Sequence, residues 1–132
     1  MADGYTMLEV DPDAAVLSGK SRTRNVDLGE ALGCESMRPR VWFVEPGNDR
    51  KNFHSHSTQE EFYYCLSGPG RMRIGDETLT VAEDTAIRVP PETPRKTFND
   101  ADEEHVWLVV GAPNVDDPGV VHEEDGSAGG RP

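Results

Sequence analysis

The sequence predicts an all-β domain, either a sandwich or a jelly-roll barrel built from short strands. Two observations predict this class. Short apolar runs recur between residues 40 and 111, and glycine or proline separates them. The chain also lacks long stretches of helical periodicity, while it contains ten prolines and thirteen glycines among 132 residues. A chain of this length corresponds to one domain with a core of its own.

The strands are expected in sequence order, each bounded by turn residues. The first clear one is "RVWFVEPG" (40–47), which Pro46 and Gly47 stop, and the second is "EEFYYCLSG" (60–68). Four further runs complete the series: "RMRIG" (71–75), "ETLTV" (77–81), "TAIRVP" (85–90) and "EHVWLVVG" (104–111). These strands place the barrel at residues 40–111.

The flanking segments differ in composition from the barrel. Residues 1–39 are expected to supply one or more N-terminal strands and a connecting segment that packs on the barrel, with "YTMLEV" (5–10) as the first strand. Residues 112–132 are acidic and rich in glycine and proline, which predicts a flexible tail.

The charge balance excludes some partners. The formal net charge is −12, from 25 acidic and 13 basic residues. Nucleic acids and anionic membranes are bound mainly through Lys and Arg, so neither is an expected partner. Three lysines stand against ten arginines, which fits either a salt-adapted organism or a GC-rich genome. Without an apolar leader or a long apolar run, a cytoplasmic location is expected.

Cysteines and isolated histidines give little functional signal. Cys34 and Cys65 form no C-x-x-C pair, which argues against a zinc ribbon or a dithiol site. Cys65 lies in an apolar strand and is expected to be a buried, inert thiol. His105 and His122 are expected at the surface.

One short stretch carries most of the chemistry. His54 and His56 are two residues apart, so in a strand they project to the same side. Glu61 on the next strand can join them, and a His₂-carboxylate set suits Fe, Mn, Ni or Zn in the divalent state. Tyr63 and Cys65 then face the same cavity as Glu61, whereas Phe62, Tyr64 and Leu66 are expected to pack on a neighbouring layer. The plainer alternative is a polar strand entrance.

The segment "GNDRKNFHSHSTQEEFYYCLSG" resembles the first motif of the cupin superfamily. That motif is a Gly, a His-x-His pair, three or four residues, Glu, six residues and Gly; Gly47, His54, His56, Glu61 and Gly68 match it, with one extra residue before His54. The resemblance spans residues 40–111. It implies a double-stranded β-helix, or jelly-roll barrel, and metal ligands at His54, His56 and Glu61. It also implies a homodimer.

The second cupin motif is incomplete. In "PPETPRKTFN" the prolines and Asn99 fit, but Glu92 replaces a glycine and Arg95 replaces the expected histidine ligand. Three alternatives follow. The first three ligands hold a metal while Arg95 turns aside or binds an anionic substrate; Arg95 pairs with Glu61 in a metal-free barrel; or Arg95 points into solvent. A guanidinium stays protonated and cannot itself coordinate a cation.

The resemblance implies several functions. An enzyme with a dioxygenase, isomerase, lyase or decarboxylase reaction would act on a small organic substrate, either neutral or anionic. Tyr63 would be its acid–base or hydrogen-bonding group and Arg95 a carboxylate clamp, although an inward aromatic is usually core and an arginine beside Lys96 is often on the surface. The alternatives are a metal-free barrel that binds a small anion or sugar, and an accessory protein without a ligand. "VHEEDGS" and "YYCLSGPG" are also similar to ectoine synthases, but "AIRVPPETPRK" lacks the Tyr and His ligands of those enzymes.

Overall fold

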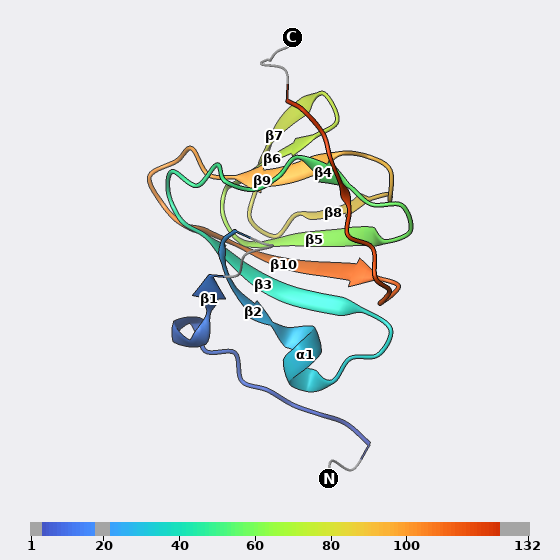
Figure 1. The fold of residues 1–132 in the computed structure, drawn as a ribbon. Coiled ribbons are helices and arrows are strands. Elements are labelled where there is room, and N and C mark those ends of the chain that lie inside the picture. The colour runs from blue at the N-terminus through green and yellow to red at the C-terminus, as the bar shows by residue number, and fades with distance from the viewer. Residues whose placement is uncertain (1–3, 18–21, 125–132) are drawn as a thin grey trace.

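The computed structural model describes residues 4–17 and 22–124, which form two antiparallel sheets packed face to face (Figure 1). One sheet has the order β1 (Val16–Leu17), β2 (Arg24–Asp27), β3 (Arg38–Val44), β10 (His105–Ala112), β5 (Glu60–Ser67) and β8 (Ala86–Val89). The other has the order β11 (Val120–Val121), β4 (His54–Ser55), β9 (Arg95–Phe98), β6 (Gly70–Ile74) and β7 (Glu77–Val81). A 3₁₀ turn (Pro12–Ala14) and α1 (Leu28–Leu32) lie near the N-terminus. This architecture confirms the expected jelly-roll barrel.

Alternation along β5 decides which side chains enter the barrel. Glu61, Tyr63 and Cys65 are 3%, 1% and 0% exposed, so all three face inward as expected. Phe62 and Leu66 are 40% and 44% exposed. The expectation that they pack on a neighbouring layer is therefore wrong, because β5 has solvent on its outer face at both positions.

On β3 the inward face changes from polar to apolar along the strand. Arg38, Arg40 and Trp42 line a cavity at one end of the barrel, and Trp42 and Val44 belong to the core. The rest of the core comes from both sheets: Tyr63, Cys65, Met72, Val81, Val89, Trp107 and Val109. The barrel is thus filled with side chains at one end and hollow at the other.

A glycine makes room for the largest side chain of the core. An added Cβ at Gly70 on β6 would lie 2.4 Å from a ring carbon of Trp107. No other residue fits there without moving the indole, because this separation is far inside van der Waals contact. The indole N–H of Trp107 donates to His105 Nδ1 at 2.7 Å.

His105 therefore does not lie at the surface, as its place in the sequence had indicated. Its ring is 1% exposed, and Nε2 donates to the Phe98 carbonyl at 3.0 Å. Buried polar groups are tolerated when they are hydrogen-bonded, and both ring nitrogens have partners here. Cys65 is a free, fully buried thiol whose pKa is raised by burial, as expected for an inert residue.

The N-terminal segment differs from its prediction. Residues 5–10 form no strand, and the first strand is β1 at Val16–Leu17. The alternation in "YTMLEV" does not suffice, since a strand also needs a partner with free backbone groups. Among the described residues, no helix is long and apolar enough to cross a membrane.

The segment after β10 lies against the barrel. We call residues 113–124 the C-terminal strap. Its strand β11 pairs with β4 through Val120 with Ser55 and Val121 with His54. Figure 1 shows the strap running upward across the edge of the sheets. Whether residues 112–132 are mobile stays a prediction, and residues 125–132 lie outside the described part.

Candidate metal centre

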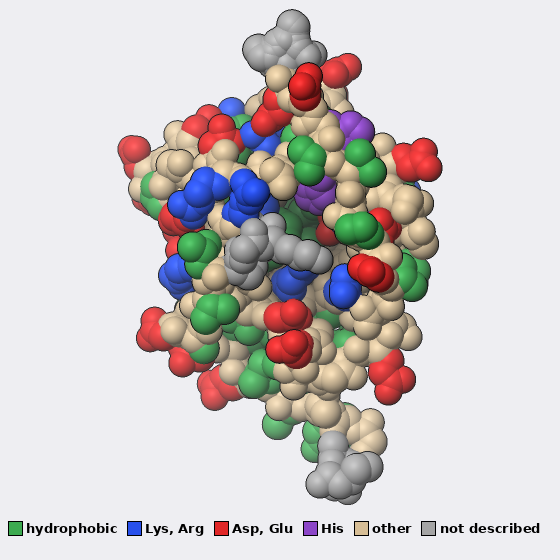
Figure 2. Space-filling model, in the orientation of Figure 1, with side chains coloured by type: hydrophobic (Ala, Val, Ile, Leu, Met, Phe, Trp, Pro, Cys, Tyr) green, Lys and Arg blue, Asp and Glu red, His purple; other side chains and the backbone are tan. Residues whose placement is uncertain are grey.

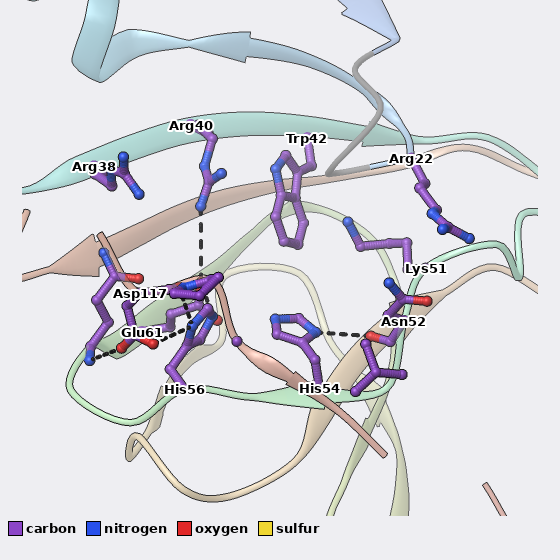
Figure 3. Close-up of a pocket in the computed structure, with 14 residues that line it drawn as sticks. Arg22, Arg38, Arg40, Trp42, Lys51, Asn52, His54, His56, Glu61 and Asp117 are labelled. Carbon is purple, nitrogen blue, oxygen red and sulfur yellow. Dashed lines mark hydrogen bonds and ion pairs between the residues drawn. The ribbon is translucent and has the colours of Figure 1, made fainter. Parts of the chain in front are cut away.

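The hollow end of the barrel contains a cavity of about 330 Å³, lined by β3, β4, β5 and the C-terminal strap. Figure 3 shows its two sides: Arg22, Arg38, Arg40, Trp42 and Lys51 lie along one, opposite His54, His56 and Glu61. The sequence-predicted ligands are thus brought together in a concave site, the usual setting of small-molecule binding.

The two histidines are held by backbone carbonyls. His54 Nδ1 lies 2.9 Å from the Asn52 carbonyl oxygen, and His56 Nδ1 lies 3.1 Å from that of Asp117. A carbonyl only accepts, so each Nδ1 carries a proton, and in the neutral form of each ring it is Nε2 that presents a lone pair. Burial lowers the pKa of His54, which favours its neutral form. Neutral imidazoles oriented this way are suited to ligate a metal ion.

Glu61 divides its two oxygens between different partners. Oε1 accepts hydrogen bonds from the Tyr63 hydroxyl at 2.7 Å and from Arg95 Nη1 at 3.2 Å. Oε2 lies 3.9 Å from His56 Nε2. The protein therefore holds Glu61 by one oxygen and leaves the other beside the histidines.

The donor set fits a divalent ion. One candidate ligand atom from each of His54, His56 and Glu61 lies within 4.8 Å of the other two. Bonds from zinc-like ions to imidazole nitrogen or carboxylate oxygen are about 2.1 Å, so neighbouring ligands of a tetrahedral ion stand about 3.4 Å apart. We call His54, His56 and Glu61 the triad. Its three ligand atoms would have to approach one another by about 1 Å to bind a common ion.

Arg95 replaces the expected fourth ligand and is fully buried at 0% exposure. It lies opposite His54 in the pairing of β4 with β9, and its Nη2 donates to the Pro90 carbonyl at 2.5 Å. The alternative in which Arg95 points into solvent is therefore wrong. The ion pair with Glu61 is present, although through one amino group.

Tyr63 and Cys65 belong to the core and do not line the cavity, so the expectation that both face it together with Glu61 is wrong. The Tyr63 ring packs edge-on against Trp42 and Trp107, with centroids 6.1 Å away in each case. Burial, with the nearby Glu61 carboxylate, raises the pKa of Tyr63 well above its ordinary value. The phenol thus stays protonated and donates to Glu61.

The C-terminal strap contributes Asp117, which the sequence analysis missed. Its Oδ2 accepts from the backbone N–H groups of Thr58 and Gln59 at 2.7 and 2.9 Å, and its Oδ1 from that of Ser57 at 3.2 Å. Burial alone would raise the pKa of Asp117, but these N–H groups hold it well below its usual range. This carboxylate fixes the turn between His56 and Glu61.

Gly119 lets the strap pass close to both histidines. Its φ is +84°, and an added Cβ would stand 3.5 Å from His56 Cε1 and 3.6 Å from a ring carbon of His54. It would also stand 3.2 Å from the Ser55 carbonyl oxygen. Neither Asp117 nor Gly119 matches a motif, so only the fold brings them here.

The opposite side of the cavity is basic, and the sequence analysis missed this too. We call Arg22, Arg38, Arg40 and Lys51 the cationic wall. Lys51 is 7% exposed and its Nζ lies 3.5 Å from the centroid of the Trp42 ring. Figure 2 shows Lys and Arg side chains gathered with histidine on one face of this acidic protein. Alternation on β3 could have indicated that Arg38 and Arg40 share a face with Trp42.

Comparison with known proteins supports the fold. An uncharacterized protein of Methanocaldococcus jannaschii is 38% identical over 56 residues, which cover 42% of this chain and 45% of the relative. The matched segment thus spans less than half of that relative.

Two solved structures are similar over most of the chain. One, named "Putative sugar phosphate isomerase" and from Acidithiobacillus ferrooxidans, has a TM-score of 0.65 and 29% identity. The match covers 73% of this chain and 62% of that one. The other is a cupin protein of Bacteroides fragilis with a TM-score of 0.71 and 22% identity, covering 87% and 89% of the two chains.

The Cupin domain family model matches residues 40–111, which is more than half of the chain and equals the range expected from the strands. These residues include His54, His56 and Glu61, together with the core residues that both sheets contribute. The protein belongs to the cupin domain family.

Proposed function

We propose that the protein is an enzyme that holds a divalent metal ion between His54, His56 and Glu61 and acts on a small organic substrate in the adjoining cavity. One observation carries this proposal. Both Nδ1 atoms are bound to carbonyls, and one candidate ligand atom from each of His54, His56 and Glu61 lies within 4.8 Å of the other two. Three such donors leave positions open for water or substrate, as in other mononuclear metal sites.

The ion would polarise a substrate oxygen. The other residues act on the ligands: Tyr63 and Arg95 hold Glu61 by Oε1, and Asp117 holds the turn that presents both His56 and Glu61. We therefore propose positioning roles for both residues. Tyr63 keeps the hydrogen-bonding role that was one of its two expected roles, and Arg95 supports Glu61 instead of clamping a substrate carboxylate. The metal is one of Fe, Mn, Ni or Zn in the divalent state.

Isomerisation is the reaction class we place first. The support is the similarity to the named isomerase of Acidithiobacillus ferrooxidans, at 29% identity. A metal site with open positions also suits this reaction, since polarising a carbonyl eases removal of a proton from the neighbouring carbon.

The test is metal content, measured by elemental analysis of protein purified without chelator. Wild type is expected to carry close to one ion per chain, and His54→Ala/His56→Ala is expected to carry almost none. Glu61→Gln and Glu60→Gln form a matched pair, because Glu60 is the neighbouring carboxylate but pairs with Arg88 on the outer face. Equal, substoichiometric metal in wild type and the double histidine variant would contradict the proposal.

A second candidate is a metal-free cupin that binds a small anion or sugar without catalysis. The buried ion pair between Arg95 and Glu61 favours it, because that pair neutralises the carboxylate without an ion. In this case elemental analysis finds no metal, while sugars or anions still bind.

We also propose a homodimer formed through the N-terminal segment. Large apolar side chains are exposed there, including Tyr5 at 65% and Met7 at 85%. Light scattering on the eluting protein distinguishes a dimer from a monomer. The cytoplasmic location and the adaptation to salt stay predictions.

A further inference from the structure

The cationic wall carries more positive charge than the cavity's own acids neutralise. Four basic residues line the cavity beside two acidic ones, Glu61 and Asp117, which leaves an excess of two positive charges when Lys51 is protonated and the histidines are neutral. Both acids are already engaged. Glu61 is bound by Tyr63 and Arg95, and Asp117 by three backbone N–H groups. Arg40 Nη2 reaches only to 3.9 Å from Glu61 Oε2.

Several basic side chains on this side also contact neutral groups of the protein. Arg22 Nη1 donates to the Arg50 carbonyl at 3.1 Å. Lys51 Nζ and the Arg40 guanidinium lie 3.5 and 5.7 Å from the centroid of the Trp42 ring. Among the described residues, Arg40 Nε and Trp42 Nε1 are buried without a hydrogen-bond partner. Such an arrangement is built for an acceptor that comes from outside the protein.

The charge state of Lys51 agrees with this view. Burial, with the neighbouring Arg40, lowers the pKa of Lys51 to about 7. Glu61 and Glu45 act in the opposite direction but do not compensate. A dianion at this wall would relieve the repulsion between the two cations.

We propose that Arg38, Arg40 and Lys51 form a subsite for the phosphate group of a small phosphorylated substrate, whose other end lies at His54, His56 and Glu61. A phosphate monoester carries between about −1.5 and −2 at neutral pH, so it would balance the positive excess and favour the protonated form of Lys51. Arginine forks suit its oxygens. The cavity of about 330 Å³ restricts the substrate to a small molecule. This inference rests on the proposed function and adds the charge and the orientation of the substrate.

The test uses ribose 5-phosphate, ribose and inorganic phosphate as probes, with calorimetry at fixed ionic strength on the full chain. Wild type is expected to bind ribose 5-phosphate at least about tenfold more tightly than ribose. Arg38→Gln and Lys51→Met are each expected to lose about tenfold in affinity for the phosphate probes and little for ribose. Arg38 is exposed, so its variant should fold even if the buried Lys51 position does not tolerate methionine.

Arg88→Gln is the matched control. It removes the same charge from a side chain that is 64% exposed and pairs with Glu60 outside the cavity. Affinities equal to wild type are expected for this variant. Equal weakening in Arg88→Gln and Arg38→Gln would show a non-specific charge effect and overturn the subsite. So would equal binding of ribose and ribose 5-phosphate.

A second arm separates this inference from the metal proposal. Chelator-treated wild type and His54→Ala/His56→Ala are expected to retain binding of inorganic phosphate, because the cationic wall does not include the triad. Phosphate binding without any metal in purified protein would reject the metal proposal and keep the subsite. Metal binding without phosphate binding would keep the metal proposal and reject the subsite. Acetate, a monoanion, should bind more weakly than inorganic phosphate. Tighter binding of acetate would overturn the phosphate assignment and indicate a subsite for a carboxylate group.

Discussion

Arg95 Nη1 and Tyr63 Oη both bind Glu61 Oε1, at 3.2 and 2.7 Å, while Glu61 Oε2 stands 3.9 Å from His56 Nε2. The residue that replaces the expected histidine thus binds the carboxylate oxygen that faces away from the other ligands. A cation beside a metal ion would be repulsive on its own. Arg95 also fixes Glu61, which is one of the three candidate ligands. Its positive charge is therefore compatible with a three-ligand site.

Arg95→His is expected to tighten metal binding. An imidazole at this position, opposite His54 in the pairing of β4 with β9, would add a fourth donor and remove a buried positive charge. We expect the dissociation constant for the metal to fall by about tenfold or more, comparable to effects of ligand support in other sites. Titration calorimetry measures it. Arg95→Gln is the control, because it removes the charge without adding a ligand, and should not match the histidine variant.

Tyr63→Phe is expected to weaken metal binding by about tenfold, because Glu61 loses the donor that fixes its Oε1. Tyr64→Phe controls for loss of a phenol, since the Tyr64 hydroxyl bonds Asp84 at 3.2 Å on the exposed side. Metal affinity and thermal unfolding are measured for both. Equal metal affinities in the two variants would show that Tyr63 is only part of the core.

The stability of the C-terminal strap is expected to depend on acid pH through Asp117. Its pKa in the folded protein lies below the unfolded value of about 3.9. Its contribution is therefore fully present above about pH 4 and is lost as the pH falls from there toward the folded pKa. Hydrogen bonds to a charged group contribute about 2 kcal/mol, so Asp117→Asn should lower the free energy of unfolding by roughly that amount at neutral pH.

Thermal unfolding between pH 3 and pH 6 checks this pH dependence. The wild-type midpoint should fall on acidification more than that of Asp117→Asn. Asp116→Asn provides the control, because Asp116 is the exposed neighbour. Parallel pH profiles for wild type and Asp117→Asn would contradict the assignment.

Gly119→Ala is expected to move the strap away from the histidines and lower both stability and metal affinity. Part of the cost is the positive φ of +84°, which destabilises a non-glycine residue by about 1–2 kcal/mol. Gly47→Ala isolates that part, since Gly47 has a φ of +80° and an added Cβ meets nothing within 4 Å. The further loss in Gly119→Ala measures the contact with Ser55 and His56. Equal losses in both variants would show that this contact does not matter.

The sequence predicted the parts of the structure that depend on alternation and on a contiguous motif. On β5, period-two alternation correctly placed Glu61, Tyr63 and Cys65 on the inner face. The spacing from His54 to Glu61 correctly indicated that the three ligand candidates meet. Both signals are local, so a single sequence contains them in full.

Strand β9 shows why other parts were missed. Arg95, Lys96 and Thr97 are all buried, so their polarity gave no sign of an inner strand. Arg95 and Lys96 are tolerated there because distant residues pair with them. Arg95 pairs with Glu61, and Lys96 Nζ donates to Asp49 and Glu124 at 2.6 Å each. Such partners follow from the fold, not from the neighbouring sequence. The cationic wall was missed for the same reason, since Arg22, Arg38 and Lys51 come from separate segments.

The C-terminal strap extends the candidate metal centre beyond the end of the family domain. The family match stops at residue 111, and a fragment cut there would retain all three ligand candidates. It would lose the carbonyl that binds His56 Nδ1, the carboxylate that caps the turn at Ser57–Gln59, and the strand that pairs with β4. Such a fragment would contain the whole family domain and lack the contact that orients His56. The boundary of the family domain is therefore not the boundary of the site, and sequences that share residues 40–111 alone should not be assumed to share its chemistry.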